Sequence, residues 1–256
     1  MQQKITYEQP LNERIRTLLR LEFLFLQAQH SLAKNSVWDH RATLLSILDI
    51  LSVCSRTDLK TEVLKELERH AAGLALLETV PGVDLAELRQ ILDQLDNLID
   101  RFHSISGQPG QGLRQNEFLN SIKQRSAIPG GLCDFDLPAY HFWLQQSAEQ
   151  RSNDLWQWLG TLETLRLSVE LILRLVRECA APTHEVAIGG FSQKSLEADN
   201  PSCQLVRVSL PANSRYYAEI SGGKQRFTVR FMQPVTGGRA VQAAEDIKFD
   251  LTCCII

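Results

Sequence analysis

Two arginines, Arg226 and Arg230, stand four positions apart in residues 226–231, where polar or charged residues alternate with apolar ones. In a β-strand this alternation places both arginines on one face, roughly 13 Å apart, with Thr228 between them. A guanidinium group can bind a carboxylate through two parallel hydrogen bonds. The pattern therefore predicts a face that can bind an acidic peptide, although an ordinary solvated sheet face has the same pattern.

The sequence around these arginines is basic. Residues 207–239 contain six basic side chains and one acidic side chain, a local charge of +5, whereas the whole chain carries −3. Such a local field attracts anionic partners. A nucleic-acid-binding module using the same arginines is the alternative, but the aromatic residues on which bases could stack are limited to Tyr216 and Tyr217.

Motifs of common enzyme classes are absent. The segment Ser221–Lys224 matches a phosphate loop only in part, because it lacks the first glycine and the hydroxyl residue after the lysine. The chain contains no His-Glu-x-x-His, no Gly-x-Ser-x-Gly and no Cys-x-x-Cys. An enzyme would need a pocket around a residue such as Cys133 or His141. We expect a protein that is not an enzyme and that needs no cofactor or metal.

Helices are expected in the first two thirds of the chain. Up to about Arg177 the apolar residues recur at helical spacing. Asp84 and Ser147 are expected to cap two of these helices. The first helix is expected to bury one side, formed by Leu11, Ile15, Leu18, Leu19, Phe23 and Leu26.

Strands are expected after Pro182, where the period changes from 3.6 to 2. Residues 206–210, 227–231 and 247–251 alternate between apolar and polar side chains, and a shorter strand is expected around 186–191. The predicted fold class is α+β, an N-terminal helical domain (residues 1–180) followed by a small antiparallel β-sheet domain (residues 181–256) with one solvent-facing side.

The sequence indicates a cytoplasmic protein. Its first residues lack the basic and then apolar pattern of a secretion signal, and charged and polar residues interrupt its most apolar stretch, 18–32. The six cysteines are scattered, as in a reduced intracellular chain. We therefore expect no membrane insertion.

Four longer segments resemble the ZapD family, the Z-ring-associated cell division proteins of bacteria. They are residues 7–23, 61–69, 128–138 (followed by His141 and Trp143) and 221–231. The segments occur in the family's order across nearly the whole chain. The resemblance is therefore much more specific than any of the short motifs above.

The resemblance implies a homodimer that binds the C-terminal tail of the tubulin-like protein FtsZ. Such a dimer would cross-link and bundle FtsZ filaments at the mid-cell division site. The helical domain would hold the dimerisation and bundling surface, and the β domain the basic peptide-binding face, with no nucleic acid expected as a partner.

The resemblance also implies roles for particular residues. Arg56, Arg226 and Arg230 match the family's tail-binding arginines, whereas Arg20 and His141 match charged positions linked to filament bundling. We add Lys224 to the tail-binding set, because the Gly-Gly turn before it would place it at the rim of the basic face.

Overall fold

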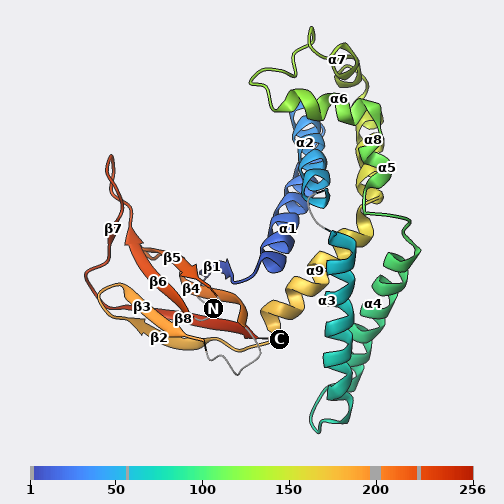
Figure 1. Cartoon of the computed structure of the whole chain (residues 1–256). Helices are drawn as coiled ribbons and strands as arrows, with labels where there is room; N and C mark the ends of the chain where they lie inside the picture. The colour runs from blue at the N-terminus through green and yellow to red at the C-terminus, as the bar shows by residue number, and fades with distance from the viewer. Residues whose placement is uncertain (1–2, 56–57, 197–202, 224–225, 256) are drawn as a thin grey trace. The chain divides into compact units, whose positions relative to one another are not determined.

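The computed structural model describes residues 3–55, 58–196, 203–223 and 226–255. The chain forms two compact units (Figure 1). The helical unit consists of residues 18–172, and the β unit consists of residues 1–17 together with 173–256. The structure thus groups residues 1–17 with the sheets, which the sequence analysis did not predict.

Apolar residues at helical spacing do form helices in the first two thirds of the chain. Asp84 and Ser147 cap two of them as predicted, each accepting hydrogen bonds from backbone N–H groups of the first turn. The helical elements are α1 (Glu13–Leu32), α2 (Val37–Cys54), α3 (Leu59–Ala75), η1 (Leu76–Thr79), α4 (Leu85–Ser104), α5 (Gln111–Arg114), α6 (Glu117–Ser126), α7 (Pro138–Leu144), α8 (Ala148–Gly160) and α9 (Glu163–Glu178).

Helix α1 buries the predicted side only as far as Leu18; beyond it, the buried side differs from the one predicted. Phe23 and Leu26 are mostly exposed, whereas Leu21 and Phe25 are buried. Seven of the nine residues at positions 18–26 are leucine or phenylalanine, so the sequence offers more than one apolar stripe. Packing in the folded unit, which local spacing does not reveal, selects between them.

A buried polar network joins α2 to α8 inside the helical unit. The Arg151 Nε donates to His40 Nδ1 at 3.0 Å, and its Nη1 donates to the backbone oxygens of Leu144 (2.9 Å) and Gln146. Ser152 Oγ lies 3.2 Å from His40 Nε2. Burial and the Arg151 charge both lower the pKa of His40, so the neutral imidazole is favoured as the acceptor.

The β unit contains two antiparallel sheets rather than the single sheet predicted. The first sheet has the order β1-β4-β8-β2, and the second has the order β3-β6-β5 with β7 beside β6. The strands are β1 (Lys4–Pro10), β2 (Thr183–Ala187), β3 (Phe191–Ser195), β4 (Cys203–Pro211), β5 (Tyr217–Gly222), β6 (Arg226–Gln233), β7 (Val241–Gln242) and β8 (Ile247–Ile255).

One hydrophobic core lies between the two sheets. Val208 of β4 and Val229 of β6 belong to the same buried cluster. The rings of Phe231 (β6) and Phe249 (β8) pack with their centroids 5.0 Å apart. Each sheet therefore turns one face to this core, as alternating strands require, and the predicted α+β fold class is confirmed.

The segment around 186–191 is two strands rather than one. Gly189 and Gly190 both adopt positive φ, 53° and 71°, and turn the chain between β2 and β3. Two consecutive residues at positive φ are typical of the tight turns that join antiparallel strands. The turn carries the chain from the first sheet to the second.

Candidate functional site

Strand β6 presents the two arginines as its alternation predicts. Phe227 and Val229 are buried in the core, whereas Arg226 and Arg230 are exposed on the opposite face and Thr228 between them is half-buried. The apolar side chains fix the strand in this orientation, because a slip of one residue would bury the arginines.

The neighbouring strands define the surroundings of each arginine. Directly opposite residues in an antiparallel pair share a face of the sheet. Arg226 lies opposite Ser195 of β3, and Arg230 lies between Phe191 of β3 and Glu219 of β5. We call this surface the arginine face; it comprises Phe191, Gln193 and Ser195 of β3, Arg226, Thr228, Arg230 and Met232 of β6, and Tyr217, Glu219 and Ser221 of β5.

A shallow hollow of about 620 Å³ opens at the Arg226 end of this face. Its lining includes Gln193, Ser221, Gly222, Arg226 and Thr228. Gly222 keeps the hollow's wall close to β6, since a Cβ on it would lie 2.8 Å from the Cβ of Phe227. Apart from Phe227 and the glycines, the lining side chains are polar, which suits a hydrogen-bonding ligand.

The arginines of the face have their charge available. Among the described residues, neither Arg226 nor Arg230 forms an ion pair or a side-chain hydrogen bond. An exposed guanidinium without an intramolecular carboxylate can bind one from a partner without first breaking a bond. The pair is therefore the feature of the second sheet best suited to an anionic ligand.

The local charge of +5 counted along the sequence overstates the charge of this face. Arg207 belongs to the first sheet and binds Glu8 of β1 at 2.9 Å, and Arg215 binds Glu245 at 2.9 Å. Burial alone would raise the pKa of Glu8, but hydrogen bonds and charge from Arg177 and Arg207 outweigh it, so that this pKa is lowered. These partners are distant in sequence, and counting charge along the chain does not reveal them.

The other predicted site residues are not brought to the arginine face by any described contact. Arg20 is exposed on α1 and His141 is exposed on α7, both within the helical unit. Arg56 and Lys224 lie outside the described residues.

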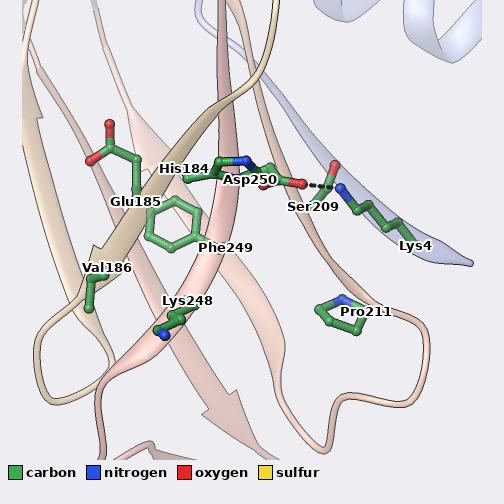
Figure 2. A pocket seen from close by; sticks show the side chains of 9 residues that line it. All are labelled: Lys4, His184, Glu185, Val186, Ser209, Pro211, Lys248, Phe249 and Asp250. Carbon is green, nitrogen blue, oxygen red and sulfur yellow. Dashed lines mark hydrogen bonds and ion pairs between the residues drawn. The ribbon is translucent and has the colours of Figure 1, made fainter. Parts of the chain in front are cut away.

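A second polar cluster, which the sequence analysis missed, lies on the outer face of the first sheet. Figure 2 shows Asp250 of β8 between His184 of β2 and Lys4 of β1. Asp250 Oδ1 is 2.5 Å from His184 Nδ1, and its other oxygen forms an ion pair with Lys4. Hydrogen bonds from Lys4 and His184 lower the pKa of Asp250. These residues come together only because strands from distant parts of the chain, β1, β8 and β2, share the first sheet.

The second cluster contains the residue types of a hydrolytic triad in an order that cannot work. Ser209 and His184 lie on either side of Asp250 in the strand register. A triad needs the histidine between serine and aspartate, so that it can take the serine proton. The hollow at this cluster, about 450 Å³, therefore gives no support to an esterase or protease activity.

Two properties of the described residues limit the kinds of site that the chain can hold. Within the described parts of the chain, no group of three or more His, Cys, Asp or Glu side chains is placed to hold a metal ion. Of the helices in those parts, none combines the length and apolar character needed to cross a membrane.

Comparison with known proteins identifies the family. The family model named ZapD, described as cell division protein, matches residues 19–230. A cell division protein ZapD of Methylococcus capsulatus is 44% identical over 256 residues, covering 100% of both chains. Similar proteins of the same name from Azoarcus sp. (39% over 252 residues; 98% of this chain, 100% of the relative) and Coxiella burnetii (39% over 254 residues; 98% of both) extend the match. The chain therefore belongs to the ZapD family, and its role is in cell division.

Proposed function

We propose that this chain is a non-enzymatic adaptor that binds the C-terminal tail of FtsZ through Arg226 and Arg230. As a homodimer it cross-links FtsZ filaments into bundles that stabilise the Z-ring at mid-cell, in the cytoplasm. Family membership supports the role in division. The observation that carries the binding proposal is the pair of exposed arginines, without carboxylate partners in the described chain, on one face of β6.

The spacing of the two arginines suits an extended acidic peptide. Four residues of strand separate them by roughly 13 Å, which matches the rise of a peptide that runs extended along β6. Each guanidinium can donate two hydrogen bonds to one carboxylate, and the polar hollow beside Arg226 can bind backbone groups of the peptide. No catalytic step is required for this activity.

Weak binding at each site is compatible with strong cross-linking. A flexible tail loses conformational entropy when it is ordered, so its affinity per site is modest. Electrostatic attraction raises the encounter rate and falls with salt. A dimer holds two sites, and a filament presents many tails, so the second binding event is effectively intramolecular.

The remaining predicted residues complete the proposal. Arg56 and Lys224 stay predicted members of the tail-binding site. Arg20 and His141, both exposed, stay predicted members of a separate bundling surface on the helical unit.

The test is a titration of a fluorescent FtsZ C-terminal peptide with the wild-type chain and with Arg226→Glu/Arg230→Glu, at low and at moderate salt. Both side chains point to solvent, so the fold should be retained. Two lost charge-assisted contacts and two introduced repulsions should weaken binding by at least about 100-fold. The same variant should fail to pellet FtsZ filaments in low-speed sedimentation.

Lys248→Glu/Arg89→Glu is the matched control, because it makes the same change of net charge at exposed positions that do not belong to the arginine face. It should retain most of the wild-type affinity. Absence of peptide binding by the wild-type chain would overturn the proposal, and equal loss in both variants would show that net charge matters rather than the site. An oligonucleotide that binds and displaces the peptide would favour the nucleic-acid alternative.

A further inference from the structure

The arginine face changes from cationic to apolar along β6. Met232 follows Arg230 by two residues on the same face, roughly 7 Å further along the strand. Tyr217 of β5 lies directly opposite Met232, and Phe191 of β3 lies directly opposite Arg230. The apolar groups therefore lie beside and beyond Arg230, at the end of the face away from the polar hollow.

Two of the apolar side chains at this end are exposed. Ile188 is 67% exposed and Phe191 is 37% exposed. An isolated β-bridge pairs these two residues, so both project to the same side of the β2–β3 turn. We call Ile188, Phe191, Met232 and Tyr217 the apolar end. Neighbouring apolar side chains of this kind, two of them exposed and two half-buried, mark interaction sites more often than scattered ones do.

The turn that carries Ile188 and Phe191 is held in place by the neighbouring loop and strand. The backbone N–H of Gly189 donates to Asp246 at 2.9 Å, and its oxygen accepts from the Gln242 side chain at 2.9 Å. A Cβ on Gly190 would lie 2.6 Å from the backbone oxygen of Ala243, so only glycine fits there. The exposed side chains thus sit on a fixed turn, which reduces the entropy lost when a ligand binds.

We propose that the apolar end binds apolar side chains of the same acidic peptide that Arg226 and Arg230 bind; this inference rests on the proposed function. The bound peptide lies extended along β6. Two carboxylates about four residues apart lie over the arginines, and an apolar side chain about two residues further lies over Met232 and Phe191. The arginines select a charged peptide, and the apolar end fixes its direction and register on the sheet.

The charge of Arg230 and the apolar side chains beside it both favour an acidic peptide with apolar residues as the ligand. An acidic peptide that lies over both arginines and continues past Arg230 places its next residues beside Phe191 and Met232. Burial of an apolar side chain there removes water from surface that is otherwise exposed, and that gain does not depend on salt. Electrostatic steering and apolar burial would then contribute to different steps, encounter and retention.

The experiment compares the wild-type chain with Phe191→Ser and with Ile188→Ser/Phe191→Ser in the peptide titration described above. We expect affinity to fall roughly tenfold for the single variant and further for the double variant, while its salt dependence stays as in the wild type. Phe191→Leu should retain most of the affinity, because it keeps an apolar surface. A peptide whose apolar residues are replaced by serine should bind the wild-type chain and Phe191→Ser equally weakly.

Val241→Ser is the matched control. Val241 is 52% exposed on β7, but it lies opposite Gln233, which belongs to the other side of the second sheet from Arg230 and Met232. Failure of the wild-type chain to bind any peptide overturns the proposed function. Normal binding by Phe191→Ser, with loss of binding in the arginine variant, overturns this inference alone. A loss in Phe191→Ser no larger than that in Val241→Ser also overturns it, and thermal melts check that each variant is folded.

Discussion

At the scale of single residues, the position of each charge matters more than the number of charges. Arg226 and Arg230 have no carboxylate partner in the described chain, whereas Arg207 and Arg215 are each paired with a glutamate. Alternation along β6 predicted the first pair correctly, because side-chain direction in a strand is a local property. Pairing of the other two depends on residues that only the fold brings close.

Glu219 limits the affinity of the arginine face for an acidic ligand. It lies directly opposite Arg230, is exposed, and its carboxylate repels an incoming carboxylate. Glu219→Gln removes this repulsion and should raise the affinity for the peptide about two- to fivefold at low salt. The gain should shrink at high salt, and a titration at two ionic strengths measures it. An unchanged or lower affinity at low salt would argue against a ligand carboxylate at Arg230.

Asp250 makes the stability of the β unit depend on pH. Its pKa is lowered by hydrogen bonds and charge from Lys4 and His184, so the carboxylate stabilises the folded state above the ordinary pKa of 3.8. This contribution is lost as pH falls through the lowered value, because the unfolded chain then binds the proton more tightly. Asp250→Asn should lower the free energy of unfolding by roughly 1 kcal/mol at pH 7.

Urea unfolding at pH 7 and at about pH 2.5 measures this difference. From pH 7 to about pH 2.5, the free energy of unfolding should fall more for the wild-type chain than for Asp250→Asn. The difference in stability between the two proteins should therefore become smaller at low pH. If the difference in free energy of unfolding between the two proteins does not change with pH, Asp250 acts through packing rather than through its charge.

At the scale of secondary-structure elements, periodicity predicts the elements whose pattern is local and complete. Strand β6 and helix α4 were predicted because an unbroken alternation or stripe runs through each. Strand β1 was missed, because its pairing with β4 joins residues about 200 positions apart. Strand β5 was missed because its inward residues, Ala218 and Ile220, give little apolar contrast with the outward Tyr217. Because these two strands were missed, the sequence predicted one sheet where the structure has two.

The junction between α7 and α8 depends on one buried side chain. Arg151 donates to the backbone oxygens of Leu144 and Gln146 and to His40. Arg151→Met keeps the apolar stem but leaves these buried acceptors without their donor, and it should lower the free energy of unfolding by roughly 2–4 kcal/mol. Urea unfolding measures the change. Arg89→Met, at an exposed position on α4, should change the free energy of unfolding by less than about 0.5 kcal/mol. Similar effects of the two variants would exclude a special role for Arg151.

At the scale of the whole molecule, the two compact units carry separable tasks in the proposed function. The arginine face and the apolar end both lie in the β unit, whereas Arg20 and His141 lie in the helical unit. The sequence predicted a helical part followed by a β part, but it could not assign residues 1–17 to the sheets. Ile5 and Tyr7 do alternate with polar residues, but the pairing that places β1 in the first sheet joins it to β4, about 200 positions later.

The place of β1 has a consequence for how the protein is made. β1 leaves the ribosome before the helical unit, and its partner β4 follows about 200 residues after β1. At translation rates of about 5–20 residues per second, the nascent strand waits for roughly 10–40 s without its sheet. The helical unit, residues 18–172, is synthesised completely within that interval. The sheet that contains β1 can therefore be completed only after the helical unit has been synthesised, when β4 and β8 have followed it.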